Sequence, residues 1–156
     1  MATSSAPLAG VRVIESSMLG PAAITTHLAD LGAEVIKIEN REQGGDATRS
    51  MGPFFLGEHD SQFFQAFNLN KKSVTLNLKH AAGREAFQRL VRTADVVLNN
   101  LRGDQPAKLG LDYASIKKLN PRVVYVSHKG FLPGPYAERT ALDEVVHPIS
   151  GDVIIK

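Results

Sequence analysis

Residues 11–39 read VRVIESSMLGPAAITTHLADLGAEVIKIE, and this stretch decides the fold class. Its first part, 11–15, alternates apolar and charged residues with β-branched side chains, which predicts a strand. Residues 22–31 predict a helix, because a proline suits its first turn and a glycine follows its end. Residues 34–39 repeat the strand pattern. A strand, a helix and a second strand at this spacing form a βαβ unit with parallel strands and a right-handed crossover.

The same alternation of strands and helices continues along the chain, interrupted by a long loop over 40–60 that has no clear period. Strands are expected at 73–78, 95–99 and 122–127, and helices at 61–69, 82–93, 111–120 and, interrupted by Pro148, at 143–149. This order predicts a single α/β domain with a doubly wound parallel sheet. Ligands of such sheets bind beyond the carboxyl ends of the strands, here at loops 16–21, 40–60, 100–104 and 128–135.

The charge is unevenly distributed along the 156 residues. The formal net charge is +2, but residues 1–60 carry a net −4 and residues 61–156 a net +6. A positive half favours an anionic ligand such as a phosphate. A solvated charged face explains the same pattern. The sequence has 43% hydrophobic and 22% charged residues, as expected for a globular protein.

Several function classes are poorly supported by composition. The chain has no Cys, which excludes a disulfide scaffold and a thiol nucleophile, and it fits a cytoplasmic protein. Ten Tyr and Phe with no Trp give little support for a surface that stacks nucleic-acid bases. No apolar run approaches the roughly 18 residues of a membrane span. We therefore expect neither a nucleic-acid nor a membrane partner.

Common catalytic and cofactor motifs are absent. The loop after the first strand reads SSMLGP, without the glycines of a dinucleotide-binding fingerprint, and there is no P-loop. The five His lack metal-ligand spacing, and no G-x-S-x-G elbow occurs, so neither a metal nor a hydrolase triad is expected. Asp46 and Arg49 lie three apart in the long loop, where a local salt bridge or a helix cap would explain them equally well. The residues alone thus indicate an α/β domain that favours an anionic ligand.

An ordered set of short motifs resembles the class III CoA-transferases, the superfamily of formyl-CoA transferase, carnitine-CoA transferase and alpha-methylacyl-CoA racemase. The motifs are PLAGVRVIE at 7–15, GP at 20–21, ADLGAEVIKIE at 29–39, GDATR at 45–49, NLNKKS at 68–73, DVVLNN at 95–100, LGLDY at 109–113, NPRVVYVS at 120–127 and GPYA at 134–137. Each motif is weak alone, but their order is specific. The resemblance implies a Rossmann-like sheet, coenzyme A as a substrate and no metal cofactor.

The resemblance also implies a set of CoA contacts, carried over by position. These are Met18, Leu19, Leu76, Lys79, Asn100, Leu101, Lys108 and, near a further basic contact, Arg139. The two lysines suit the phosphates of CoA because an ammonium group pairs with them as a point charge. Solvated lysines are the alternative. Asp46 and Arg49 match a family loop motif without an assigned role. The family's residue after the second strand is often basic, and here it is Asn40.

The resemblance covers residues 7–146 and only the N-terminal part of the family's large domain, so the Rossmann-like sheet is expected to be truncated. The small domain, the C-terminal part and the Asp nucleophile of the family lie beyond Lys156, so no catalytic residue is assigned. The expected function is the CoA-binding part of an acyl-CoA:carboxylate CoA-transferase, inactive alone, with a second copy or a complementing chain as partner. Alternatives are a racemase-type member, which would need a His where Leu142 stands, and a non-catalytic CoA-binding remnant.

Overall fold

The structure is a computed structural model that describes residues 6–131 except 59, residues 134–137 and residue 139. Five parallel strands form the central sheet in the order β5-β2-β1-β6-β7. Their bounds are β1 (Arg12–Ser16), β2 (Glu34–Glu39), β5 (Lys72–Thr75), β6 (Val96–Asn99) and β7 (Val124–Ser127). The α/β fold with a parallel sheet that the sequence predicts is confirmed.

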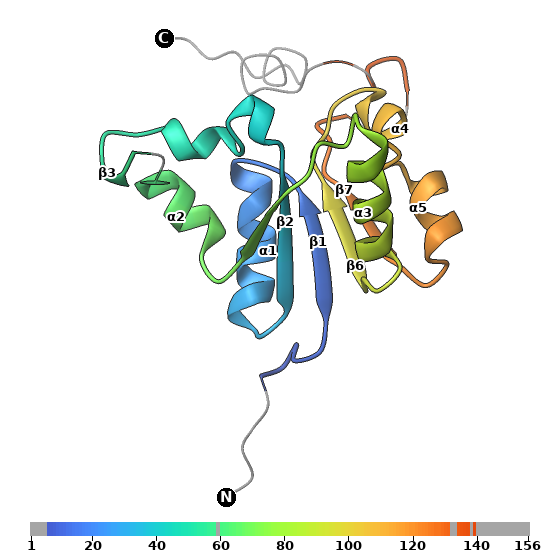
Figure 1. Cartoon of the computed structure of the whole chain (residues 1–156), viewed down its shortest axis with the longest axis horizontal. Helices are drawn as coiled ribbons and strands as arrows, with labels where there is room; N and C mark the ends of the chain where they lie inside the picture. The colour runs from blue at the N-terminus through green and yellow to red at the C-terminus, as the bar shows by residue number, and fades with distance from the viewer. Residues whose placement is uncertain (1–5, 59, 132–133, 138, 140–156) are drawn as a thin grey trace, which may run out of the picture.

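Helices cover both faces of this sheet (Figure 1). Their bounds are α1 (Gly20–Asp30), α2 (Gln62–Asn68), α3 (Ala81–Val91), α4 (Gln105–Leu109) and α5 (Tyr113–Leu119). Successive side chains of a strand point to opposite faces. Val13 therefore packs in a small core with residues of α1, whereas its neighbour Ile14 packs with Phe87 of α3 and Ile116 of α5 in the larger core.

The path of the chain places a switch point next to β1. After β1 the chain adds β2 and β5 on one side, and α3 then carries it back to β6 and β7 on the other side. The connections that leave β1 and β6 thus run in opposite directions across the sheet. In open α/β sheets a crevice opens at such a point, beyond the carboxyl ends of the strands.

The segment 40–60, predicted as a loop without regular structure, contains four short elements. Two are 3-10 helices, η1 (Arg41–Gln43) and η2 (Ala47–Ser50), and two are the antiparallel strands β3 (Phe55–Gly57) and β4 (Asp60–Ser61). Asn40 and Asp46 start the 3-10 helices by accepting hydrogen bonds from the backbone N–H groups of Glu42 and Thr48. Side-chain capping therefore organises this connection where hydrophobic periodicity does not.

Two other elements differ from the sequence prediction. The strand expected at 73–78 spans only Lys72–Thr75, because its partner β2 ends at Glu39, opposite Thr75. Helix α4 was not predicted, since five residues are too few to show a helical period. The helix expected at 143–149 lies outside the described residues. Within the described ranges, no helix combines the length and hydropathy needed to cross a bilayer.

Candidate functional site

A cavity of about 560 Å³ opens at the carboxyl edge of the sheet. It is lined by the ends of β1 and β2, the segment after β5, the loop after β6 and helix α4. Figure 1 shows α4 above the ends of β6 and β7. The cavity coincides with the switch point, which is where the fold predicts a ligand site.

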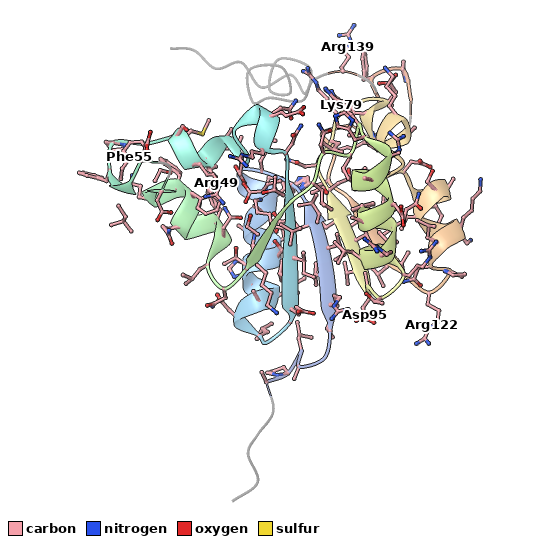
Figure 2. All side chains as sticks on the ribbon, in the orientation of Figure 1. Arg49, Phe55, Lys79, Asp95, Arg122 and Arg139 are labelled. Atoms are coloured by element: carbon pink, nitrogen blue, oxygen red, sulfur yellow. The ribbon has the colours of Figure 1, made fainter. Side chains whose placement is uncertain are left out.

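Basic residues form part of the cavity lining. Lys79 and Arg84 come from the segment after β5 and from α3, and Lys108 comes from α4. Arg84 donates to the carbonyl of Lys79 at 2.8 Å, and Lys108 pairs with Asp104 at 2.7 Å. The ammonium group of Lys79 has no hydrogen bond or ion pair within the described part of the chain, and Figure 2 shows this residue at the same edge of the sheet. The lining also contains Lys37 and three acids, each of which is paired with a cation of the protein: Asp46 with Lys37, Glu39 with Arg49 and Asp104 with Lys108. Lys79 and Arg84 have no carboxylate partner among the described residues, and they favour an anionic ligand.

The remaining residues that the resemblance points to are divided by the structure. Met18, Leu76 and Leu101 line the cavity together with Lys79 and Lys108. Asn100 does not line it, but its side-chain amide hydrogen-bonds both backbone polar groups of Met18, at 3.0 and 3.3 Å. The sheet topology thus collects residues from four separate stretches of the sequence within one region.

Leu19 and Arg139 lie outside the lining of the cavity. Leu19 is exposed and precedes α1 with a φ of +59°, a conformation unusual for a residue other than glycine. Arg139 is exposed, stacks on the ring of Tyr136 with 4.8 Å between the guanidinium and the ring centroid, and projects outward beyond Lys79 in Figure 2. In this structure neither residue faces the cavity.

A network of buried charges supports the floor of the cavity. The ammonium of Lys37, 1% exposed, contacts Glu15 Oε1 at 2.9 Å, Asp46 Oδ2 at 2.8 Å and the carbonyl oxygen of Ser17 at 2.6 Å. Lys71 pairs with the other carboxylate oxygen of Glu15 at 2.8 Å. Two acids and two bases balance here, which is the condition under which charges tolerate burial.

A second ion pair adjoins this network. Arg49 makes a two-pronged contact with Glu39, at 2.9 and 2.7 Å, and its guanidinium lies 3.7 Å from the ring centroid of Phe64. Burial alone would raise the pKa of Glu39, but hydrogen bonds, first from Arg49 and next from Ser73, outweigh it and lower this pKa to about 2. The hydrogen bond with Glu39 also raises the pKa of Arg49.

The structure resolves the alternatives for the loop motif at 46–49. Asp46 is a helix cap, accepting from the N–H and hydroxyl groups of Thr48, and also the ion-pair partner of Lys37. Arg49 pairs with Glu39 rather than with Asp46. The charge alternation in the first two strands concealed this network, because Glu15 and Lys37 look solvent-facing. The network could have been predicted from the parallel sheet. Its inner strands are buried on both faces, so charged residues of opposite sign in register must pair.

Three polar atoms along the cavity are buried without a hydrogen-bond partner among the residues described. They are Asp46 Oδ2, whose contact is the ion pair with Lys37, Ser16 Oγ, at the end of β1, and Asn77 Nδ2, after β5. Buried polar groups are nearly always hydrogen-bonded, so each such exception asks for an explanation. A hydroxyl and an amide N–H group suit a polar organic ligand. No cluster of His, Asp or Glu suited to a metal occurs in the described ranges.

The parallel sheet, with a cavity at its switch point and basic residues in the lining, defines an α/β protein whose candidate site favours an anionic ligand. More specifically, residues 8–155 match the model of CoA-transferase family III, and the chain belongs to that family. The resemblance seen in the sequence is thereby confirmed.

Two curated relatives and one solved structure show how similar the chain is to known proteins. The chain is 46% identical to the succinate–glutarate CoA-transferase of Agrobacterium fabrum over 93% of its own length and 38% of the relative's. It is 41% identical to the acetyl-CoA:oxalate CoA-transferase of Acetobacter aceti, and the match covers 93% of this chain and 37% of the relative. The crystal structure of a CAIB/BAIF family protein from Brucella suis superimposes with a TM-score of 0.85 at 41% identity. The superposition covers 94% of this chain and 40% of the Brucella chain. The chain thus spans about two-fifths of the length of these proteins.

Proposed function

We propose that residues 1–156 form the N-terminal part of a CoA-transferase large domain and that the cavity binds coenzyme A. The observation that carries this proposal is the basic cavity at the switch point, lined by Lys79, Arg84 and Lys108. CoA combines several phosphate charges with a long polar arm that contains amides. A cavity with cations, apolar groups and hydrogen-bonding groups in its lining fits such a ligand.

The side chains suggest a division of work. Lys79 and Lys108 would pair with phosphates, and Lys79 is suited because its ammonium group is not committed elsewhere in the described structure. Met18, Leu76 and Leu101 would pack against the apolar parts of the ligand, while Asn100 fixes the Met18 backbone. Leu19 and Arg139 would contribute only at the outer edge.

The reaction proposed for the complete enzyme is transfer of CoA between an acyl-CoA and a carboxylic acid. An Asp carboxylate oxygen attacks the acyl carbon, the carbon–sulfur bond breaks, and CoA leaves as the thiolate with an acyl anhydride formed on the enzyme. The family resemblance implies that this Asp comes after residue 156. The contribution proposed for this chain is therefore to bind and orient CoA.

A transferase is favoured over a racemase. The sequence has Leu142 where a racemase-type member would carry a proton-transferring His, and the relatives named above are CoA-transferases. We extend the proposal to a cytoplasmic location and to association with a second copy or a complementing chain. Phe54 and Leu56 of the β3 region are 69% and 82% exposed, and such apolar surface favours association. Light scattering that shows only monomer would contradict the association.

Calorimetric titration of the purified chain tests the binding proposal. CoA and acetyl-CoA should bind and release heat, and pantetheine, which lacks the phosphates, should bind much more weakly. Raising the salt concentration should weaken CoA binding, because cation–phosphate attraction is screened. The absence of heat with both CoA and acetyl-CoA would contradict the proposed function.

A further inference from the structure

Lys37 lines the cavity, yet three groups of the protein already surround its ammonium group. The ammonium donates hydrogen bonds to Glu15 Oε1 at 2.9 Å and to the carbonyl oxygen of Ser17 at 2.6 Å. It also forms an ion pair with Asp46 Oδ2 at 2.8 Å. Two carboxylates of the protein therefore balance its charge, and a direct contact with CoA phosphate is not the role inferred for this lysine.

The three partners of Lys37 belong to separate parts of the cavity wall. Ser17 lies in the loop between β1 and α1, directly before Met18. Asp46 lies beyond β2, and its backbone N–H donates to Glu39 Oε2 at 2.9 Å. Ser17 and Asp46 both line the cavity. One buried ammonium thus sets the distance between two loops that are about thirty residues apart in sequence.

We infer that Lys37 is a positioning residue for CoA binding: it holds the loop after β1 and the loop after β2 at the separation that the ligand requires. This inference rests on the proposed function. Without the ammonium, Glu15 and Asp46 would remain as two buried carboxylates facing a single cation, Lys71. Carboxylates in that situation attract water or protons and move apart. The two loops would then separate, and the cavity would lose its shape.

Lys71 provides a matched comparison within the same network. It is as well buried as Lys37 and also pairs with Glu15, at 2.8 Å. Its other acceptors, however, are the carbonyl oxygen of Ala22 in α1 and Asn68 Oδ1 in α2, and Lys71 does not line the cavity. Removing either lysine leaves the same unbalanced charge. Only removal of Lys37 releases the cavity loops.

The test compares Lys37→Met with Lys71→Met, since methionine keeps most of the volume and removes the charge. Urea unfolding gives the stability of each variant, and CoA titration is run where both are folded. Lys37→Met should weaken CoA binding about tenfold or more, against less than threefold for Lys71→Met. Hydrogen exchange of the free protein should accelerate over 16–19 and 44–49 in Lys37→Met only.

Failure of the positioning role of Lys37 and failure of CoA binding give different results. Folded Lys37→Met that binds CoA like the wild type, or equal weakening in both variants, would overturn the positioning role. A wild type that does not bind CoA would overturn the proposed function, while the hydrogen-exchange comparison would still decide whether Lys37 holds the loops. If Lys37→Met does not fold, Asp46→Asn replaces it, because this change keeps the size of the side chain and removes the charge that Lys37 contacts. Unchanged loop exchange and CoA affinity in Asp46→Asn would then overturn the inference.

Discussion

The side chain of Asn100 continues the sheet beyond its last backbone pair. Ser16 and Asn99 are the final register partners of β1 and β6. One residue further, Asn100 Nδ2 donates to the carbonyl oxygen of Met18 at 3.0 Å, and Asn100 Oδ1 accepts from the Met18 N–H at 3.3 Å. The amide thus replaces a strand neighbour and joins the two loops that flank the switch point. The cavity lies where β1 and β6 diverge, and this contact limits how far their loops can separate.

Replacing both Lys79 and Lys108 by Ala should weaken CoA binding about tenfold or more and flatten its dependence on salt, because two phosphate-pairing charges are lost. Titrations at low and high salt measure both effects. The control variant replaces Lys117 and Lys118 on α5, which are exposed and do not line the cavity, and it removes the same charge. If both double variants lose affinity equally, the effect is due to net charge and the assigned phosphate contacts are wrong.

Ser16→Ala should change stability and affinity in opposite directions. The Ser16 hydroxyl is buried without a partner within the described ranges, so its removal should leave the free protein equally stable or more stable by about 1 kcal/mol. If CoA provides the missing partner, the same change should weaken CoA binding severalfold. Thermal unfolding and calorimetry on the same samples give both values. A variant that binds CoA as tightly as the wild type would show that the ligand does not use this hydroxyl.

Glu39 should make stability dependent on acid pH. Its pKa in the folded chain is about 2, below the ordinary value of 4.5. A lowered carboxyl pKa stabilises the folded state above the unfolded pKa, and this contribution, at most about 3 kcal/mol, is lost as the pH falls from 5 toward 2. Urea unfolding at several pH values should show a steeper acid loss for the wild type than for Glu39→Gln. If the stability of both proteins falls equally with pH, Glu39 does not cause the acid dependence.

The isolated chain should not catalyse CoA transfer. The family resemblance implies that the carboxylate required by the proposed reaction comes after residue 156 and that Asp152 stands too early in the sequence to match it. An effective nucleophile must also be held close to its target geometry. Incubation with radiolabelled acyl-CoA and several carboxylic acids should give no transfer above background. Transfer that disappears in Asp152→Asn would identify Asp152 as the nucleophile instead.

The sequence was most informative where local rules and the fold agree. The segment 11–39 forms β1, α1 and β2 because alternation, the proline at the helix start and Gly32, at φ +98°, all favour the same structure. Alternation continues through Leu78, but β5 stops at Thr75, where its neighbour β2 ends, and strand length therefore depended on a partner. Motif order led to the residues of the cavity region, whereas the buried network required knowledge of which strand faces are covered.

The buried charges also have a consequence for how the sheet assembles. Strands β1 and β2 are short, similar in pattern and parallel, so hydrophobicity alone discriminates weakly between alternative alignments. In the observed alignment Glu15 stands opposite Lys37. A shift of β2 by one residue would turn Lys37 toward the core that Ile14 shares with α3. The described residues of that core cluster are hydrophobic, so Lys37 would lose its carboxylate partner there. An unpaired buried ammonium costs several kcal/mol, so the ion pair penalises misaligned chains during folding.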